Sequence, residues 1–134
     1  YETITEEIEG IAKTLPALIK AHKVQKKVAK VGFDFKDVIE AATKVEEEKN
    51  EILDVYKTNN REKIMNEVGD LLFACVNVSR LLEVDEEEAL NKSINKFIKR
   101  FAFVEKELSK AGKDIKSSTI DEMNLLWEES KKYD

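Results

Sequence analysis

The sequence has few of the residues that cross-link or interrupt a chain. Among its 134 residues there are one cysteine, one proline and four glycines. One cysteine cannot form an internal disulfide and is typical of a reducing compartment, so we expect a cytoplasmic protein. No apolar run approaches the length of a membrane span, and we expect no membrane partner. The first residue is Tyr1 rather than Met, which leads us to expect a piece of a longer chain.

With so few interruptions, the elements of structure should be long. Hydrophobic residues make up 42% and charged residues 38% of the chain, which fits neither a disordered nor a membrane protein. Alanine, leucine, lysine and glutamate dominate and favour helix, and no stretch alternates cleanly enough to predict a strand. We therefore predict an all-α domain, a bundle of about five helices whose short connections make neighbours antiparallel.

Local signals predict where these helices begin and end. Pro16 suits a first helical turn, and Gly32 suits a left-handed C-terminal cap. Asp34 or Asp37 starts the second helix, and a turn at "TNN" separates it from the third. Capping-box patterns, Asp85 with Glu88 and Thr119 with Glu122, start the fourth and fifth helices. The expected helices cover about 16–32, 34 or 37–57, 61–83, 85–112 and 119–131.

Charge is distributed in blocks along the chain. Lys13 to Lys36 contains seven lysines and one acid, Asp37 to Asp54 seven acids and two lysines, and Lys92 to Lys110 six basic residues and two acids. Such alternation lacks the basic face of a duplex-DNA binder, so we expect no nucleic-acid polymer as a partner. It would suit a metal ion with a polyanionic small molecule, although solvated helix faces produce the same pattern.

Carboxylates occupy positions where two of the helices should be apolar. On the second helix, Glu48 falls inside the predicted core stripe and Glu51 borders it. That stripe consists of Val38, Ala42, Val45, Ile52 and Val55. On the third helix, Glu67 and Asp70 flank an apolar side made of Ile64, Val68, Leu71, Leu72, Cys75 and Leu82. If the two helices pack together, four carboxylates face a shared space.

Such a cluster needs compensation. Two like charges about 4 Å apart repel by roughly 4 kcal/mol at an effective dielectric near 20, and burial adds a desolvation cost. The acids can spread into water, become protonated or bind a cation. Oxygen ligands without a nearby His or Cys indicate Mg²⁺, or Mn²⁺ as a substitute, rather than zinc. The alternative is that the acids face solvent or pair with lysines such as Lys44, Lys49 and Lys63.

Two motifs resemble a known family. "EEKNE" (47–51) followed by "EVGD" (67–70) matches the EExxE…ExxD pattern of the MazG family, all-α nucleoside triphosphate pyrophosphohydrolases. Further similar segments, such as "LPALIKAHKVQKKVAKVGFDF" and "EMNLLWEESK", extend the resemblance over about 15–131. It implies a catalytic domain over 15–134, the second of a tandem pair, with 1–14 as an N-terminal extension or linker remnant. It also implies an intertwined homodimer.

The resemblance also implies roles for individual residues. The implied Mg²⁺ ligands are Glu48, Glu51, Glu67 and Asp70, with Glu48 or Glu51 as the catalytic base. The implied substrate contacts are Lys96 and Arg100 at the triphosphate, with Lys63 and Trp127 near the nucleotide. For Trp127, a place in the core or at a dimer interface is the alternative. Cys75 is expected to be a core thiol, and His22 an exposed polar residue.

The implied reaction converts a ribo- or deoxyribonucleoside triphosphate to its monophosphate and pyrophosphate, either in house-cleaning or in control of the nucleotide pool. Two other functions stay open. One is a pyrophosphatase specific for dUTP or dCTP. The other, of a different class, is a non-catalytic helical dimerisation module whose acids are solvated.

Overall fold

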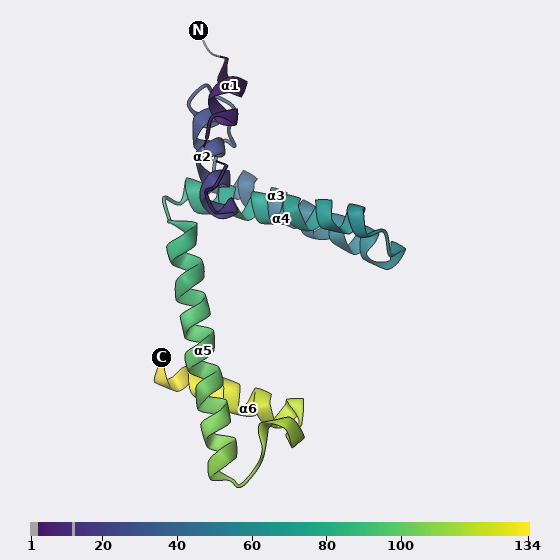
Figure 1. Ribbon diagram of the computed structural model, residues 1–134, viewed down its shortest axis with the longest axis vertical. Helices are drawn as coiled ribbons and strands as arrows, with labels where there is room; N and C mark the ends of the chain where they lie inside the picture. The colour runs from purple at the N-terminus through teal and green to yellow at the C-terminus, as the bar shows by residue number, and fades with distance from the viewer. Residues whose placement is uncertain (1–2, 12) are drawn as a thin grey trace. The chain divides into compact units, whose positions relative to one another are not determined.

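The computed structural model describes residues 3–11 and 13–134, and within these ranges every regular element is a helix (Figure 1). The all-α prediction is confirmed. The helices are α1 (Ile4–Glu9), α2 (Ala17–Ala29), α3 (Val38–Val55), α4 (Arg61–Leu81), α5 (Glu86–Lys110) and α6 (Ile120–Ser130). Short 3-10 turns follow α3 (η1, Tyr56–Thr58), precede α6 (η2, Ile115–Ser117) and follow it (η3, Lys131–Tyr133). The described part of α1 was not predicted.

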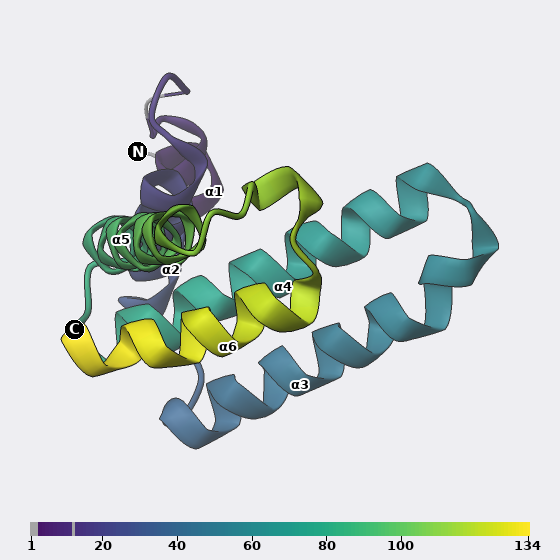
Figure 2. The same ribbon diagram turned by 90° about the horizontal axis from the view of Figure 1, so that it is seen from below.

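Two compact units make up the fold, residues 1–87 and residues 88–134. In the first unit, α3 and α4 form a hairpin and run side by side along their lengths (Figures 1 and 2). The predicted turn between them consists of η1, a left-handed Asn59 (φ 58°) and Asn60, whose side chain accepts a hydrogen bond from the backbone N–H of Lys63. Helix α2 packs against α4.

Helix ends follow the local signals closely. Gly32 has φ 94°, and the N–H of Phe33 donates to the carbonyl of Val28 at 3.1 Å, which closes α2 in the predicted left-handed cap. Asp37, rather than Asp34, caps α3 by accepting a hydrogen bond from the N–H of Glu40. Thr119 and Glu122 form both bonds of the predicted capping box. Helix α5 begins at Glu86, directly after Asp85, as expected.

The apolar stripes were predicted with less success. Ala41, fully buried, takes the core position on α3 that was assigned to the exposed Ala42. Three residues of the apolar side predicted for the third helix are exposed: Val68 and Leu72 on α4, and Leu82 directly after it.

Cys75 is also exposed, so the prediction of a core thiol is wrong. Ala74, Val76 and Asn77 are the residues of α4 that are buried. Apolar residues surround much of this helix, and neighbouring positions on a helix differ by about 100° in direction. Because apolar residues occur on most sides of α4, its sequence does not reveal which side packs against α2 and α3.

The second unit contains most of α5 together with η2, α6 and η3. Val104 and Leu108 of α5 are buried. The helix ends at Lys110 and is followed by a left-handed Gly112 (φ 74°), after which the N–H of Lys113 donates to the carbonyl of Leu108 at 2.9 Å. The rings of Phe97 and Trp127 lie 5.1 Å apart, centre to centre. No helix in the described part of the chain is both long and apolar enough to cross a membrane.

Candidate functional site

Three carboxylates converge where α3 packs on α4. One side-chain oxygen from each of Glu48, Glu67 and Asp70 lies within 4.8 Å of the others. Glu67 and Asp70 are one helical turn apart on α4 and therefore face the same way. The hairpin brings Glu48 of α3 opposite to them. The group could hold a metal ion, and all its donors are carboxylate oxygens, the type that hard divalent cations prefer.

The three acids differ in burial. Glu48 is 8% exposed, Glu67 is half-buried and Asp70 is exposed. The group therefore extends from the buried interface between α3 and α4 to the solvent-exposed surface. Lys44, one turn earlier on α3, places its Nζ 3.1 Å from Oε1 of Glu48. The hydrogen bond to Glu48 is the main reason that the pKa of Lys44 is raised. A buried carboxylate is thus compensated in part by one lysine, as the alternative interpretation of these acids predicted.

The second predicted lysine partner bonds elsewhere. Nζ of Lys49 lies 2.6 Å from Oε1 of Glu46, an exposed acid outside the cluster. Lys63 is exposed in the first turn of α4, one turn before Glu67. Lysine pairing therefore accounts for Glu48 but, among the ion pairs of the described residues, not for Glu67 or Asp70.

The neighbouring negative charges change the pKa of Glu67. The pKa of its carboxyl is raised, first by loss of solvation and then by the negative charges of Glu51, Asp70 and Glu48. Glu51 is therefore close enough to repel Glu67, although it lies outside the group of three converging oxygens. A carboxyl that favours its proton because of neighbouring anions will also gain from a bound cation.

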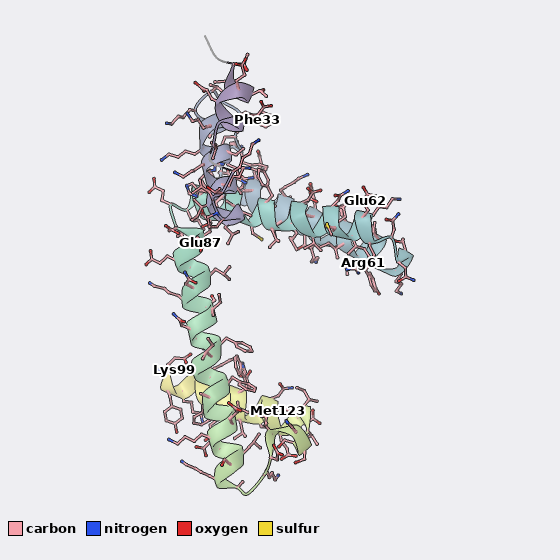
Figure 3. All side chains as sticks on the ribbon, viewed as in Figure 1. Phe33, Arg61, Glu62, Glu87, Lys99 and Met123 are labelled. Carbon is pink, nitrogen blue, oxygen red and sulfur yellow. The ribbon has the colours of Figure 1, made fainter. Side chains whose placement is uncertain are left out.

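An open pocket of about 760 Å³ lies beside the cluster, with Glu48 and Asp70 in its wall. Three aromatic side chains, from the segment after α2 and from α4, also line it: Phe33, Phe35 and Phe73. Figure 3 labels Phe33 on that segment.

Polar residues that the sequence analysis did not select also line this pocket: Gln25, Asp34, Asn77 and Arg80. Arg80 holds Asp34 with two hydrogen bonds, of 2.5 and 3.1 Å, and this bonding is the main cause of the lowered pKa of Asp34. Gln25 could have been noticed, because it follows Val24 and precedes Val28 on the inner side of an otherwise lysine-rich helix. The Asp34–Arg80 pair spans 46 positions and leaves no local signal.

His22 is another residue whose surroundings differ from the prediction. It is half-buried rather than exposed, and its Nδ1 lies 2.8 Å from Oε2 of Glu86, the first residue of α5. The pair joins residues distant in sequence, so its position on a lysine-rich helix did not reveal it.

The other predicted substrate contacts belong to the second unit. The guanidinium of Arg100 lies 5.7 Å from the centre of the Trp127 ring and forms an ion pair with Asp134. That pair lowers the pKa of Asp134 and raises that of Arg100. Lys96, one turn before Arg100 on α5, is exposed. Arg100 and Trp127 are thus neighbours, and Trp127 is half-buried against Phe97.

These features define a class: an all-α protein with a carboxylate cluster able to hold a metal ion beside an open pocket. Residues 39–104 match the MazG nucleotide pyrophosphohydrolase domain. Together with the relatives described next, this match shows that the chain belongs to the MazG family.

Curated relatives resemble nearly the whole chain. It is 38% identical, over 92% of its length, to the nucleoside triphosphate pyrophosphohydrolase/pyrophosphatase MazG of Thermotoga maritima. It is 35% identical over 95% to the nucleoside triphosphate pyrophosphohydrolase of Escherichia coli, and 40% over 92% to the uncharacterized protein YabN of Bacillus subtilis. The chain spans about half the length of the first two relatives, 48% and 49%, and 26% of the third.

Proposed function

We propose that this chain hydrolyses nucleoside triphosphates to monophosphate and pyrophosphate in a Mg²⁺-dependent reaction. The observation that carries the proposal is the convergence of Glu48, Glu67 and Asp70 within 4.8 Å, beside a pocket of about 760 Å³. The names of two relatives supply the reaction, because both are described as nucleoside triphosphate pyrophosphohydrolases.

The proposed metal ligands are Glu48, Glu51, Glu67 and Asp70. Bound Mg²⁺, or Mn²⁺ in its place, would neutralise phosphate charge and lower the pKa of a coordinated water. An all-oxygen donor set with several negative charges fits such an ion. Either Glu48 or Glu51 accepts the proton of the attacking water. Lys44, by donating to Glu48, holds that side chain in place before the substrate arrives.

The proposed substrate contacts are Lys63, Lys96, Arg100 and Trp127. Arg100 offers a planar guanidinium that can bind two phosphate oxygens at once. Its present partner, the Asp134 carboxylate, is itself an anion with two acceptor oxygens. We propose that the triphosphate replaces Asp134 at Arg100 and that the Trp127 ring, already against the guanidinium, supports the same group.

We also propose a homodimer. Large apolar side chains on α4 and α5 stay exposed within each unit, among them Met65, Leu72, Leu90, Ile94 and Ile98. Covering such faces with a second copy removes apolar surface from water. Light scattering after size exclusion at micromolar concentration is expected to give twice the mass of 15.4 kDa. A monomeric mass at that concentration contradicts the dimer.

The test is pyrophosphate release from a panel of ribo- and deoxyribonucleoside triphosphates with Mg²⁺. The test variant is Glu48→Gln, and the matched control is Glu46→Gln, an exposed acid on the same helix. Turnover by wild type and the control, lost in Glu48→Gln and in EDTA, supports the proposal. Activity confined to dUTP or dCTP would indicate a narrow pyrophosphatase. Absence of turnover by the folded protein on every nucleotide would favour the dimerisation module.

A further inference from the structure

A buried amide on α2 has one end without a partner. Gln25 is 3% exposed, and its Nε2 donates a hydrogen bond to the backbone carbonyl of Phe73 at 3.0 Å. Its Oε1 is buried and accepts no hydrogen bond from any residue that the structure describes. An unsatisfied buried acceptor costs about 1–3 kcal/mol. Since Gln25 lines the pocket beside the carboxylate cluster, a ligand there can satisfy it.

The orientation of this amide is fixed by chemistry. A backbone carbonyl only accepts hydrogen bonds, so the amide nitrogen of Gln25 must face the carbonyl of Phe73. The opposite orientation would place two oxygens against each other. The atom of Gln25 left without a partner is therefore an acceptor, and the complementary ligand group is an N–H or O–H donor.

The rest of the wall describes the remainder of the ligand. Phe33, Phe35 and Phe73 supply aromatic surface of the kind on which a flat ring stacks. The charged residues are largely neutralised in pairs, Arg80 with Asp34 and Lys44 with Glu48.

Asp70 and Glu40 add further negative charges to the same wall. Away from a bound metal ion, a phosphate group would be repelled by these acids, whereas a neutral flat heterocycle with a donor on its edge would be accepted. A second buried polar atom without a partner in the described chain, Nε of Arg80, belongs to a residue of the same wall.

We propose that Gln25 is a specificity-determining residue, whose Oε1 accepts a hydrogen bond from an N–H on the hydrogen-bonding edge of the nucleobase. The inference rests on the proposed function for the identity of the ligand as a nucleotide. It assigns the base to the α2 side of the cluster and the phosphates to its opposite, solvent-facing side. A site built around a buried acceptor discriminates against ligands that leave that acceptor unpaired.

The first test changes the ligand rather than the protein. ATP is compared with the triphosphate of purine riboside, which lacks the amino group, and CTP with its analogue lacking the 4-amino group. UTP is compared with N3-methyl-UTP. For at least one pair, kcat/KM is expected to fall about ten- to hundredfold, the ratio that corresponds to one lost buried hydrogen bond. Equal rates within all three pairs would overturn the inference, and a resident water on Oε1 would then be the explanation.

The second test adds Gln25→Met, which keeps the length of the side chain and removes the acceptor. The matched control is Lys23→Met, an exposed position two residues earlier on the same helix. The discrimination is expected to disappear in Gln25→Met and to persist in Lys23→Met. Undiminished discrimination by folded Gln25→Met contradicts the proposal. Should this variant fail to fold, the analogue pairs on wild type decide the question alone.

A binding measurement separates this inference from the proposed function. Calorimetric titration of wild type with AMP and with purine riboside monophosphate, in EDTA, requires neither metal nor turnover. Weaker binding of the analogue without turnover of any triphosphate would remove the enzyme and keep the base site. Turnover with equal treatment of every pair would keep the enzyme and remove Gln25 as a specificity residue. No binding and no turnover would remove both.

Discussion

Nζ of Lys44 and Oε1 of Glu48 lie 3.1 Å apart, one helical turn from each other on α3, and Glu48 is the buried member of the carboxylate cluster. The lysine thus supplies one positive charge to a group with three or four negative ones. This ion pair compensates Glu48 in the absence of a metal, and it competes with any cation that Glu48 binds. Several expected outcomes depend on that competition.

Metal addition is expected to stabilise the protein. A cation that binds the folded state alone at about 100 times its Kd adds about 2.7 kcal/mol to the free energy of unfolding. Differential scanning fluorimetry with and without Mg²⁺ should show the increase in Tm for wild type and for Glu46→Gln. Asp70→Asn, which removes one ligand charge, should reduce it. Equal Tm with Mg²⁺ and with EDTA would contradict a metal site at this cluster.

Lys44→Met is expected to have opposite effects with and without metal. Without metal, the variant leaves Glu48 buried and without its lysine, and the free energy of unfolding should fall by about 1 kcal/mol, a figure discounted for the partial exposure of the lysine. With Mg²⁺, the loss of a competing cation should tighten metal binding. Urea unfolding and metal titration measure the two effects. Lys49→Met, which breaks an exposed pair, is the control. An unchanged metal affinity would show that Lys44 does not compete.

The raised pKa of Glu67 predicts the pH dependence of stability. Its carboxyl binds a proton more readily in the folded than in the unfolded chain, because of lost solvation and the surrounding acids. At pH values above the ordinary pKa of 4.5, the folded chain therefore holds more protons at this position than the unfolded chain does. This contribution to stability is fully present below that pH and is lost as pH rises through the raised pKa. Bound Mg²⁺ should abolish the decline.

Urea unfolding across pH 4 to 8, without metal, measures this effect. The comparison is wild type against Glu67→Gln, which cannot titrate at this position. A wild-type curve parallel to that of the variant would contradict the assignment to Glu67. Asp34 and Asp134, whose pKa values are lowered, contribute in the opposite sense and are common to both proteins.

Glu83→Gly is expected to stabilise the first unit. Glu83 has φ 59° in the left-handed cap after α4, where the N–H of Val84 donates to the carbonyl of Ser79 at 3.0 Å. Left-handed backbone costs about 1 kcal/mol for a residue with a Cβ and little for glycine. The midpoint of urea unfolding should therefore increase. Glu87→Gly, in the first turn of α5, is the contrasting control and should lower the midpoint, because it removes a negative charge from the N-terminal end of the helix and adds a flexible residue there. A lower midpoint for Glu83→Gly would mean that the Glu83 side chain stabilises the folded state by more than its left-handed backbone costs.

The sequence predicts local features well because their causes are local. Thr119 and Glu122 are three residues apart and cap α6 as expected, and Gly32 closes α2. The buried position of Glu48 was predicted because an acid within an apolar stripe is visible from spacing alone.

Features that depend on contacts distant in sequence were missed. The Asp34–Arg80 pair, the amide of Gln25 against Phe73 and the His22–Glu86 pair join segments far apart along the chain. The exposure of Cys75 was missed for the same reason. Which side of α4 is buried depends on where α2 and α3 pack against it, and the sequence of α4 alone does not determine that side. The proposed ligand set itself stays a prediction that the metal titrations test.

Glu48 and Asp70 lie equally far in sequence from Asn59, the left-handed residue at the tip of the α3–α4 hairpin. One residue added to either arm would turn that arm by about 100° and advance it by about 1.5 Å. Glu48 would then no longer face Glu67 and Asp70. During divergence of this chain, substitutions in the "TNN" turn should be tolerated more readily than insertions or deletions. The length of a remote surface turn would thus be inherited together with the carboxylates, although no atom of the turn belongs to the cluster.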